Sequence, residues 1–279
     1  MLKIAAEELK IIAQYIHEIS GISLDQSKSY LFETRLGSIA EELGCTSYRA
    51  LYDKARRDPA KKIERQIIDA ISTNETLFFR DTSPFELLKH KIFPDIIDAR
   101  APRSPHTKSN IRIWSSASST GQELYSIAMT LDELLGAQIK NFNFQLLGTD
   151  ISDNVVKQAS YGKYNKFEIE RGLSRQTLQK YFTLFGDSWK VKDQLRGMVN
   201  FRKFNLMHPF TGLGKFDIIF CRNVAIYFTL EDRKKLFNKI ADSLADDGYL
   251  IIGSTESLTG ICSRFVPKRH LRAIFYQKK

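Results

Sequence analysis

Apolar side chains recur at helical spacing through the first quarter of the chain. Leu9, Ile12 and Ile16 would share one face of a helix that ends near Gly21. Further helices are expected at about residues 27–43, 47–55 and 60–71. Residues 1–72 are therefore predicted to form a small all-helical N-terminal domain.

From residue 73 onward, short apolar runs alternate with helical patterns. The expected strands lie at about residues 111–114, 142–147, 199–206, 216–221, 249–252 and 271–277. The expected helices between them lie at about residues 83–98, 124–135, 152–160 and 230–244. This order is typical of a doubly wound, Rossmann-like α/β sheet that ends in a hairpin, and residues 73–279 would form it.

The unit formed by residues 111–151 carries the first candidate chemistry. Its first strand runs into seven consecutive small residues, 115–121, and its second strand ends at Asp150. Ligands of such sheets lie beyond the carboxyl ends of the strands, and small residues allow a ligand to approach the backbone and the start of the helix. A plain structural turn with a surface aspartate is the alternative interpretation.

Two later strands also end in polar side chains, namely Asn205 and the pair Arg222 and Asn223. Together with Asp150 they would line one edge of the sheet, and this convergence favours a nucleoside pocket over a structural turn. A nicotinamide dinucleotide would need three glycines in the turn, where only Gly121 is present. S-adenosylmethionine is therefore the expected cofactor, with Asp150 accepting hydrogen bonds from both ribose hydroxyls.

The segment that joins the helical part to the sheet, residues 72–81, combines polar side chains with Phe78 and Phe79. Buried aromatic rings would hold the polar side chains at fixed positions, as in a ligand-facing loop. An ordinary interdomain linker is the alternative interpretation.

Charge narrows the choice of partner. The 279 residues carry a formal net charge of +10. Residues 1–72 hold 11 basic and 11 acidic side chains, so the whole excess lies in the C-terminal part. A basic surface favours an acidic partner, either nucleic acid or a carboxylate-rich protein surface, and charge alone does not choose between them.

Cysteine content and hydropathy exclude several classes of protein. Cys45, Cys221 and Cys262 are isolated, lack metal-ligand spacing and suit a reducing compartment, so no metal site is expected. No apolar run approaches the roughly 20 residues that span a bilayer. The N-terminal residues also contain no apolar signal core, so we expect a cytoplasmic monomer without membrane insertion.

Five short motifs occur in order along the chain. They are Thr73-Asn74-Glu75-Thr76 with Phe78-Phe79-Arg80, residues 118–123 with Tyr125-Ser126, Asp150-Ile151, Asn205-Leu206, and residues 220–224 with Ile226-Tyr227-Phe228. Each motif is weak alone, but the ordered set is highly specific. Over nearly its whole length, the chain resembles the CheR-type chemoreceptor glutamate methyltransferases.

The resemblance implies methyl transfer from S-adenosylmethionine to glutamate carboxylates in the cytoplasmic helical region of chemoreceptors. The product would be glutamate methyl esters, formed in chemotactic adaptation. The implied cofactor-binding residues are Asn74, Thr76, Arg80, Glu123, Asp150, Asn205, Leu206, Arg222 and Asn223. Arg80 and Tyr227 are further implied to lie near the transferred methyl group.

Two features depart from the family pattern. Gln122 precedes Glu123 where the family commonly has two glutamates. Because the second glutamate is retained, we expect the pocket to be intact. The family also carries a small β-subdomain, which in some members docks a receptor's C-terminal pentapeptide as an added strand. The matching stretch here, about residues 185–201, is short, so the sequence does not predict binding of that tail.

The implied reaction needs few catalytic groups. A glutamate side chain, with a reference pKa of about 4.3, is already ionised at neutral pH, so no general base is required. The five histidines are scattered along the chain, in agreement with this expectation.

A nucleic-acid methyltransferase is the rival enzyme, and a non-catalytic signalling adaptor is the rival from another class. Residues 221–224 lack the Asn/Asp-Pro-Pro-aromatic motif of amino-methylating enzymes. Cys221 follows Phe220, whereas a C5 methylase needs a Pro-Cys nucleophile. The joint presence of Arg80, Asp150 and Tyr227 speaks against an adaptor. No nucleic-acid partner is therefore expected.

Overall fold

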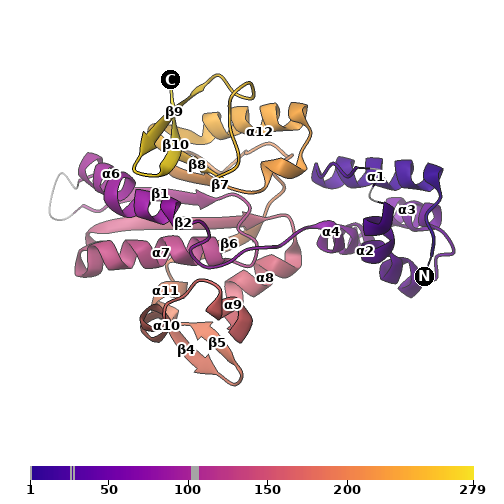
Figure 1. The fold of residues 1–279 in the computed structure, drawn as a ribbon, viewed down its shortest axis with the longest axis horizontal. Helices are drawn as coiled ribbons and strands as arrows, with labels where there is room; N and C mark the ends of the chain where they lie inside the picture. The colour runs from indigo at the N-terminus through magenta and orange to yellow at the C-terminus, as the bar shows by residue number, and fades with distance from the viewer. Residues whose placement is uncertain (1, 26, 28, 102–106) are drawn as a thin grey trace.

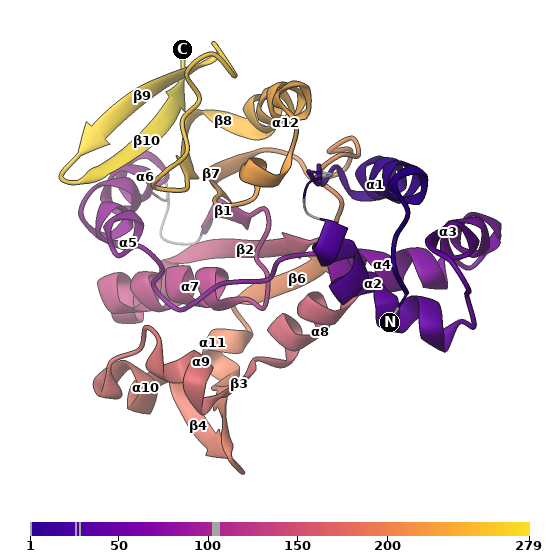
Figure 2. The ribbon, with the colours of Figure 1, turned by 45° about the vertical axis from the view of Figure 1, so that its right-hand side comes forward.

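The computed structural model describes residues 2–25, 27, 29–101 and 107–279. It comprises a helical lobe, a seven-stranded sheet flanked by helices, and a separate three-stranded sheet (Figures 1 and 2). Within the described residues, no helix combines the length and apolar character required to cross a bilayer.

The helical lobe packs around its own apolar core. Its helices are α1 (Ala6–Ser20), α2 (Ser29–Glu42), α3 (Tyr48–Arg57) and α4 (Lys62–Ile71). Ile12, Phe32, Leu51 and Ile67 are almost fully buried in this core. α1 ends at Gly21, whose φ of 76° is the left-handed conformation in which helices commonly terminate. The all-helical prediction is confirmed.

The seven-stranded sheet has the order β6-β2-β1-β7-β8-β10-β9. Its strands are β1 (Ser109–Ser115), β2 (Phe142–Asp150), β6 (Val199–Lys203), β7 (Phe216–Cys221), β8 (Leu244–Ile252), β9 (Phe265–His270) and β10 (Ala273–Lys278). The first five strands of the spatial order are parallel, and β10 is antiparallel to both its neighbours. Strand order reverses between β1 and β7, which is where ligands of such sheets bind. The predicted doubly wound sheet and closing hairpin are confirmed.

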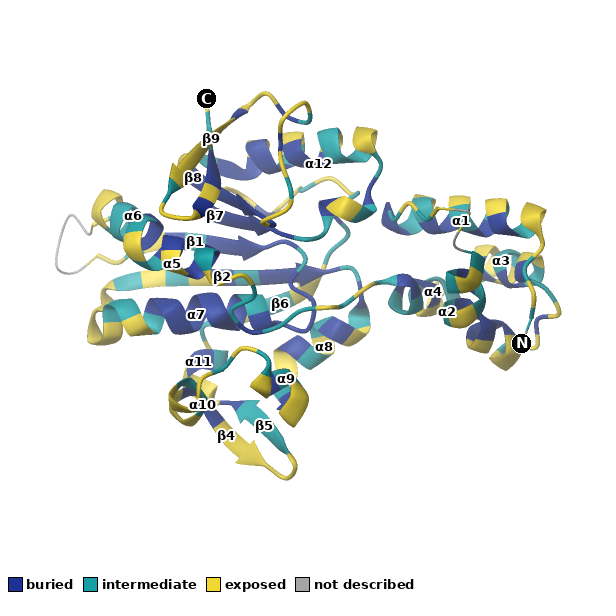
Figure 3. Cartoon of the chain, viewed as in Figure 1, coloured by how far each residue is buried: buried dark blue, intermediate teal, exposed yellow. Residues whose placement is uncertain are grey.

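Helices cover both faces of this sheet (Figure 3). They are α5 (Ser83–Leu87), η2 (Leu88–Ile92), α6 (Phe93–Ala99), α7 (Gln122–Leu135), η3 (Gly136–Asn141), α8 (Asp153–Tyr161), η4 (Ala225–Tyr227) and α12 (Leu230–Ser243). In β7, Ile218 and Phe220 join the core shared with α7, whereas Ile219 and Cys221 join the core shared with α12. All of β7 is buried, as expected for a parallel strand that is covered on both faces.

The three-stranded sheet lies elsewhere than the sequence suggested. It contains β3 (Lys163–Asn165), β5 (Ser188–Val191) and β4 (Phe182–Phe185), in that spatial order, together with α9 (Lys166–Glu170), α10 (Arg175–Tyr181) and α11 (Asp193–Arg196). The expected β-subdomain at about residues 185–201 is thus corrected to about 163–191. Residues 199–203 pair with β2 in the larger sheet instead. Strands of three or four residues are too short to show a period-two pattern, which is why the sequence missed them.

This small sheet packs against the segment that joins the two larger parts of the protein. Phe78 is fully buried, and its ring meets Tyr164 and Phe182 edge-on at centroid distances of 5.0 and 5.5 Å. A Cβ atom on Gly172 would lie 2.0 Å from the Phe78 carbonyl oxygen. The buried aromatic side chain expected in residues 72–81 is therefore present, and the small sheet provides the surface against which it packs.

We expect Gly172→Ala to destabilise the protein, because the added methyl group would collide with the Phe78 backbone. Overpacking of this kind costs about 1–3 kcal/mol, measurable as a lower free energy of unfolding in urea. Gly197→Ala is the matched control, because Gly197 has a helical φ of −67° and its nearest neighbouring atom would lie at 3.3 Å. Equal stability of the two variants would contradict the close approach at Gly172.

Candidate active site

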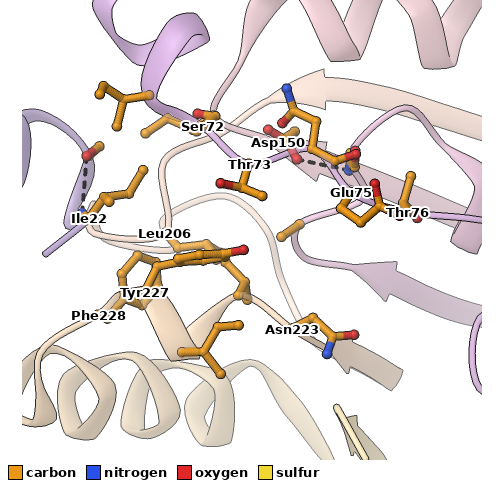
Figure 4. A pocket seen from close by; sticks show the side chains of 18 of the residues that line it. Ile22, Ser72, Thr73, Glu75, Thr76, Asp150, Leu206, Asn223, Tyr227 and Phe228 are labelled. Atoms are coloured by element: carbon orange, nitrogen blue, oxygen red, sulfur yellow. Dashed lines mark hydrogen bonds between the residues drawn. The ribbon is translucent and has the colours of Figure 1, made fainter. Parts of the chain in front are cut away.

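A cavity of about 390 Å³ lies beyond the carboxyl ends of β1, β2 and β7. All the site residues expected from the sequence line it: Asn74, Thr76, Arg80, Glu123, Asp150, Asn205, Leu206, Arg222, Asn223 and Tyr227. Figure 4 shows Asp150 and Thr76 on one side of the cavity and Tyr227 and Asn223 on the other. Tertiary structure thus brings together five segments that are far apart in sequence.

The small residues after β1 form a tight turn at the cavity floor. The Ser118 backbone N–H donates to the Thr149 carbonyl at 2.9 Å, which ties the turn to β2. Ser119 adopts a left-handed φ of 49°. Gly121 also has a positive φ, of 96°, and a Cβ atom there would lie 2.9 Å from the Ala159 Cβ of α8. Backbone conformation and the closeness of α8 therefore both explain the small residues in this turn.

Asp150 is held rigidly at the tip of β2. Its Oδ2 accepts the Ser119 backbone N–H at 2.9 Å, and its Oδ1 accepts the Ser152 backbone N–H at 3.1 Å. The residue is only 8% exposed, and this burial raises the pKa of its carboxyl, while the backbone hydrogen bonds oppose the shift. The carboxylate is therefore oriented before any ligand arrives.

Arg222 anchors the opposite wall of the cavity. Its side chain is 1% exposed and donates to Glu123 Oε2 at 2.8 Å and to Asp81 Oδ2 at 2.9 Å. It also donates to the Arg80 carbonyl at 2.9 Å. Glu123 accepts a second hydrogen bond, from the Ser115 hydroxyl, at 2.8 Å. Arg222 and Glu123 thus bind each other and fix the loop that carries Arg80.

That loop is strained around Arg80. Phe79 and Asp81 flank it with left-handed φ values of 51° and 56°. The Arg80 Nη1 donates to the Glu75 carbonyl at 2.9 Å, so one arm of its guanidinium is fixed within the loop. Such strain persists only where the surroundings enforce it, and it is concentrated at ligand-binding sites.

The helical lobe closes the cavity from the other side, which the sequence did not predict. Ile22, Leu24 and Arg35 line the cavity. The Asn205 Nδ2 donates to the Ile19 carbonyl at 2.9 Å, and the Ser23 N–H donates to the Tyr227 carbonyl at 2.8 Å. No local pattern reveals these residues, because their role arises only from packing against a distant part of the chain.

Two protein-family models match the chain. The model of the CheR methyltransferase SAM binding domain matches residues 74–270, and that of the CheR methyltransferase all-alpha domain matches residues 7–72. The chain belongs to the CheR methyltransferase family. It is an S-adenosylmethionine-dependent methyltransferase of chemotaxis.

Named relatives cover nearly the full length of the chain. Chemotaxis protein methyltransferase Cher2 of Pseudomonas putida is 38% identical over 95% of this chain and 95% of its own. The chemotaxis protein methyltransferase of Vibrio parahaemolyticus is 38% identical over 100% of this chain and 99% of its own. The solved structure of a TehB-like SAM-dependent methyltransferase from Corynebacterium glutamicum is 15% identical, with a TM-score of 0.37 over 66% of this chain and 86% of its own.

The polar groups around the cavity suit S-adenosylmethionine. The Asp150 carboxylate lines the cavity and can accept hydrogen bonds from ribose hydroxyls. The Ser116 hydroxyl also lines the cavity and can donate or accept a hydrogen bond there. The donors and acceptors present therefore fit the cofactor of the family.

We expect Arg222→Met to reduce the free energy of unfolding by on the order of 3 kcal/mol, because Glu123 would remain buried without a cation. Arg196→Met is the control: the Arg196–Asp193 pair is solvent-exposed, and loss of such a pair costs less than about 1 kcal/mol. The double variant Arg222→Met/Glu123→Gln should recover part of the loss. Chemical denaturation measures all three, and a cost no greater than that of the control would contradict the anchoring role of Arg222.

Proposed function

We propose that this protein transfers the methyl group of S-adenosylmethionine to glutamate side chains of chemoreceptors, forming glutamate methyl esters. The convergence of Arg80, Asp150, Asn223 and Tyr227 on one cavity, in a chain of the CheR family, carries this proposal. The relatives that are named chemotaxis protein methyltransferases support it.

The chemistry of a carboxylate substrate agrees with the residues around the cavity. S-adenosylmethionine supplies a methyl group on a positively charged sulfur. A glutamate carboxylate forms the new C–O bond while the S–C bond breaks, which yields a methyl ester and S-adenosylhomocysteine without any proton transfer. No base is needed for an ionised nucleophile. Among the described residues that line the cavity there is no histidine or lysine, in keeping with such a reaction.

Catalysis then rests on positioning and on the exclusion of water. In this proposal Asp150 holds the ribose, and Arg80 binds one oxygen of the substrate carboxylate so that the other can attack in line. Tyr227 forms the wall next to the reacting groups and is itself held by the Ser23 N–H. The remaining expected residues, Asn74, Thr76, Glu123, Asn205, Leu206, Arg222 and Asn223, shape the cofactor pocket.

The two parts of the chain have different roles in this proposal. Residues 73–279 form the catalytic domain in this proposal, and residues 1–72 cover its cavity. The partner is the cytoplasmic helical region of a receptor, whose carboxylates are attracted by the basic excess of the C-terminal part. The enzyme acts as a cytoplasmic monomer. The three-stranded sheet has β4 as an edge strand, which supports docking of a receptor tail as an added strand in this proposal.

The rival nucleic-acid methyltransferase finds no support at the reacting centre. Cys221 is fully buried, and burial raises the pKa of its thiol, so it is unsuited to attack a base.

The test of the proposed function is methyl transfer from radiolabelled S-adenosylmethionine to receptor cytoplasmic fragments, with RNA and DNA as parallel substrates. We expect label on the receptor only, released as methanol by mild base because esters hydrolyse. Replacement of the receptor glutamates by alanine is the control. Base-stable label, or label on nucleic acid, would overturn the proposal.

Affinity for S-adenosylhomocysteine should fall as the pH is lowered through the raised pKa of Asp150. The ribose hydroxyls bind the ionised carboxylate, so affinity is complete above this pKa and lost below it. The loss should begin above the ordinary aspartate value of about 3.9. Calorimetry across the acid range measures this profile. Asp150→Asn should bind more weakly at neutral pH and lack this step, and a wild-type profile equal to that of Asp150→Asn would remove Asp150 from the ribose site.

Arg80→Lys should impair turnover far more than cofactor binding. Lysine keeps the charge but loses the planar fork that fixes two donors at set angles. A misplacement near 1 Å can reduce the rate on the order of a hundredfold. The measurements are turnover at saturating cofactor and the affinity for S-adenosylhomocysteine. Wild-type turnover would mean that Arg80 supplies charge alone, and a parallel loss of affinity would make it mainly a cofactor ligand.

A further inference from the structure

Two turns at the carboxyl edge of the sheet are joined by a single carboxylate. β7 and β8 are parallel neighbours, with Cys221 opposite Ile252, so the turns that follow them start side by side. Glu256 lies in the second turn, and its Oε2 accepts the backbone N–H of Asn223 at 2.8 Å. The same oxygen accepts the backbone N–H of Gly253 at 2.7 Å. One atom thus fixes both turns.

Asn223 needs such support. Its φ of 56° is left-handed, a conformation that asparagine tolerates better than most residues other than glycine but that is uncommon without support from neighbouring groups. It follows the buried Arg222 directly and lines the cavity. A backbone held in this conformation by a charge-assisted hydrogen bond aims the Asn223 side chain at one place on the cavity wall.

The two turns pack closely at Gly253. A Cβ atom on Gly253 would lie 2.5 Å from Glu256 Oε2 and 2.9 Å from Asn223 Nδ2. The hydroxyl of Ser254 also donates to Asp81 Oδ2 at 3.3 Å, so the second turn touches the network around Arg222 as well. Glycine at position 253 is thus what allows the carboxylate of Glu256 to approach Asn223.

Glu256 also lacks a cation. In the part of the chain that the structure describes, no lysine, arginine or histidine forms an ion pair with it. Its Oε1 is buried without a hydrogen-bond partner. Glu256 is partly buried, and its carboxylate accepts hydrogen bonds from the two backbone N–H groups. Its interactions therefore hold the two turns together.

We propose that Glu256 is a positioning residue for methyl transfer: it holds Asn223 in its left-handed conformation on the cavity wall and acts on the reaction through it. The kinetic consequence of this inference depends on the proposed function. Its structural consequence depends on the geometry alone.

The test compares Glu256→Ala, Glu256→Gln and Ser257→Ala in the receptor methylation assay. Glu256→Ala removes the acceptor that holds Asn223. It should lower turnover at saturating cofactor by about tenfold or more, because misplacement of a side chain beside the reacting groups reduces the rate. Glutamine keeps an oxygen that can accept both N–H groups, so Glu256→Gln should retain at least about a fifth of wild-type turnover. Ser257 is exposed and its hydroxyl contacts Thr259, so Ser257→Ala should match the wild type.

A merely structural role would lower the melting temperature together with turnover. In Glu256→Ala we expect the melting temperature to stay near the wild-type value, whereas the affinity for S-adenosylhomocysteine should fall with turnover because Asn223 shapes the cofactor pocket. Wild-type turnover in Glu256→Ala, no rescue in Glu256→Gln, or a loss of turnover matched by a fall in melting temperature would each overturn the inference. If Glu256→Ala does not fold, Glu256→Asp has a side chain shorter by one methylene group, which withdraws the carboxylate from Asn223, and it should show a similar loss of turnover.

A crystal structure of Glu256→Ala, or of Glu256→Asp in its place, separates failure of this inference from failure of the proposed function. We expect Asn223 to leave its left-handed conformation. An unchanged Asn223 overturns the inference whatever the substrate is. Inactivity of the wild-type protein on receptor fragments would instead count against the proposed function, and the displacement of Asn223 would still decide the role of Glu256.

Discussion

The buried guanidinium of Arg222 is the interaction on which the rest of the site depends. It lies at the end of β7, beside the point where strand order reverses, and it binds Glu123 of α7 and Asp81 of the connecting loop. A charge that is 1% exposed must be paired, so these three segments cannot move apart independently. The loop that carries Arg80 is therefore placed by the sheet, although it precedes β1 by many residues.

The helical lobe completes the site from outside the sheet. It accepts a hydrogen bond from the Asn205 side chain after β6 and donates one to the Tyr227 carbonyl after β7, and His17 of α1 binds Asp232 of α12 at 2.8 Å. A cavity with walls from both parts can exclude water from a reaction between opposite charges, which strengthens electrostatic interactions within it. The shape of the cavity and the packing of the helical lobe are consequently linked through the same residues.

Backbone strain is concentrated where these segments meet. Among the described residues other than glycine, six have a positive φ, and Phe79, Asp81, Ser119 and Asn223 belong to the loops around the cavity. Each of these loops is held by side chains from elsewhere: Ser126 accepts the Phe79 N–H, Asp150 the Ser119 N–H and Glu256 the Asn223 N–H. The surrounding fold thus enforces conformations that the loops would not adopt alone.

The sequence alone determined the classes of element, the doubly wound sheet and the polar strand ends that line the cavity, and the family resemblance supplied the other expected residues. Hydrophobic periodicity depends on local spacing, and polar residues after buried strands must meet at one edge of a parallel sheet, so Asp150, Asn205 and Asn223 could be assigned together. Only the tertiary structure decided three further features: the three-stranded sheet at 163–191, the cover that residues near Ile22 and Arg35 provide, and the bridge made by Glu256. The last two arise from contacts between segments distant in sequence, which no local pattern encodes, whereas the strands of the small sheet are too short to show a period-two pattern.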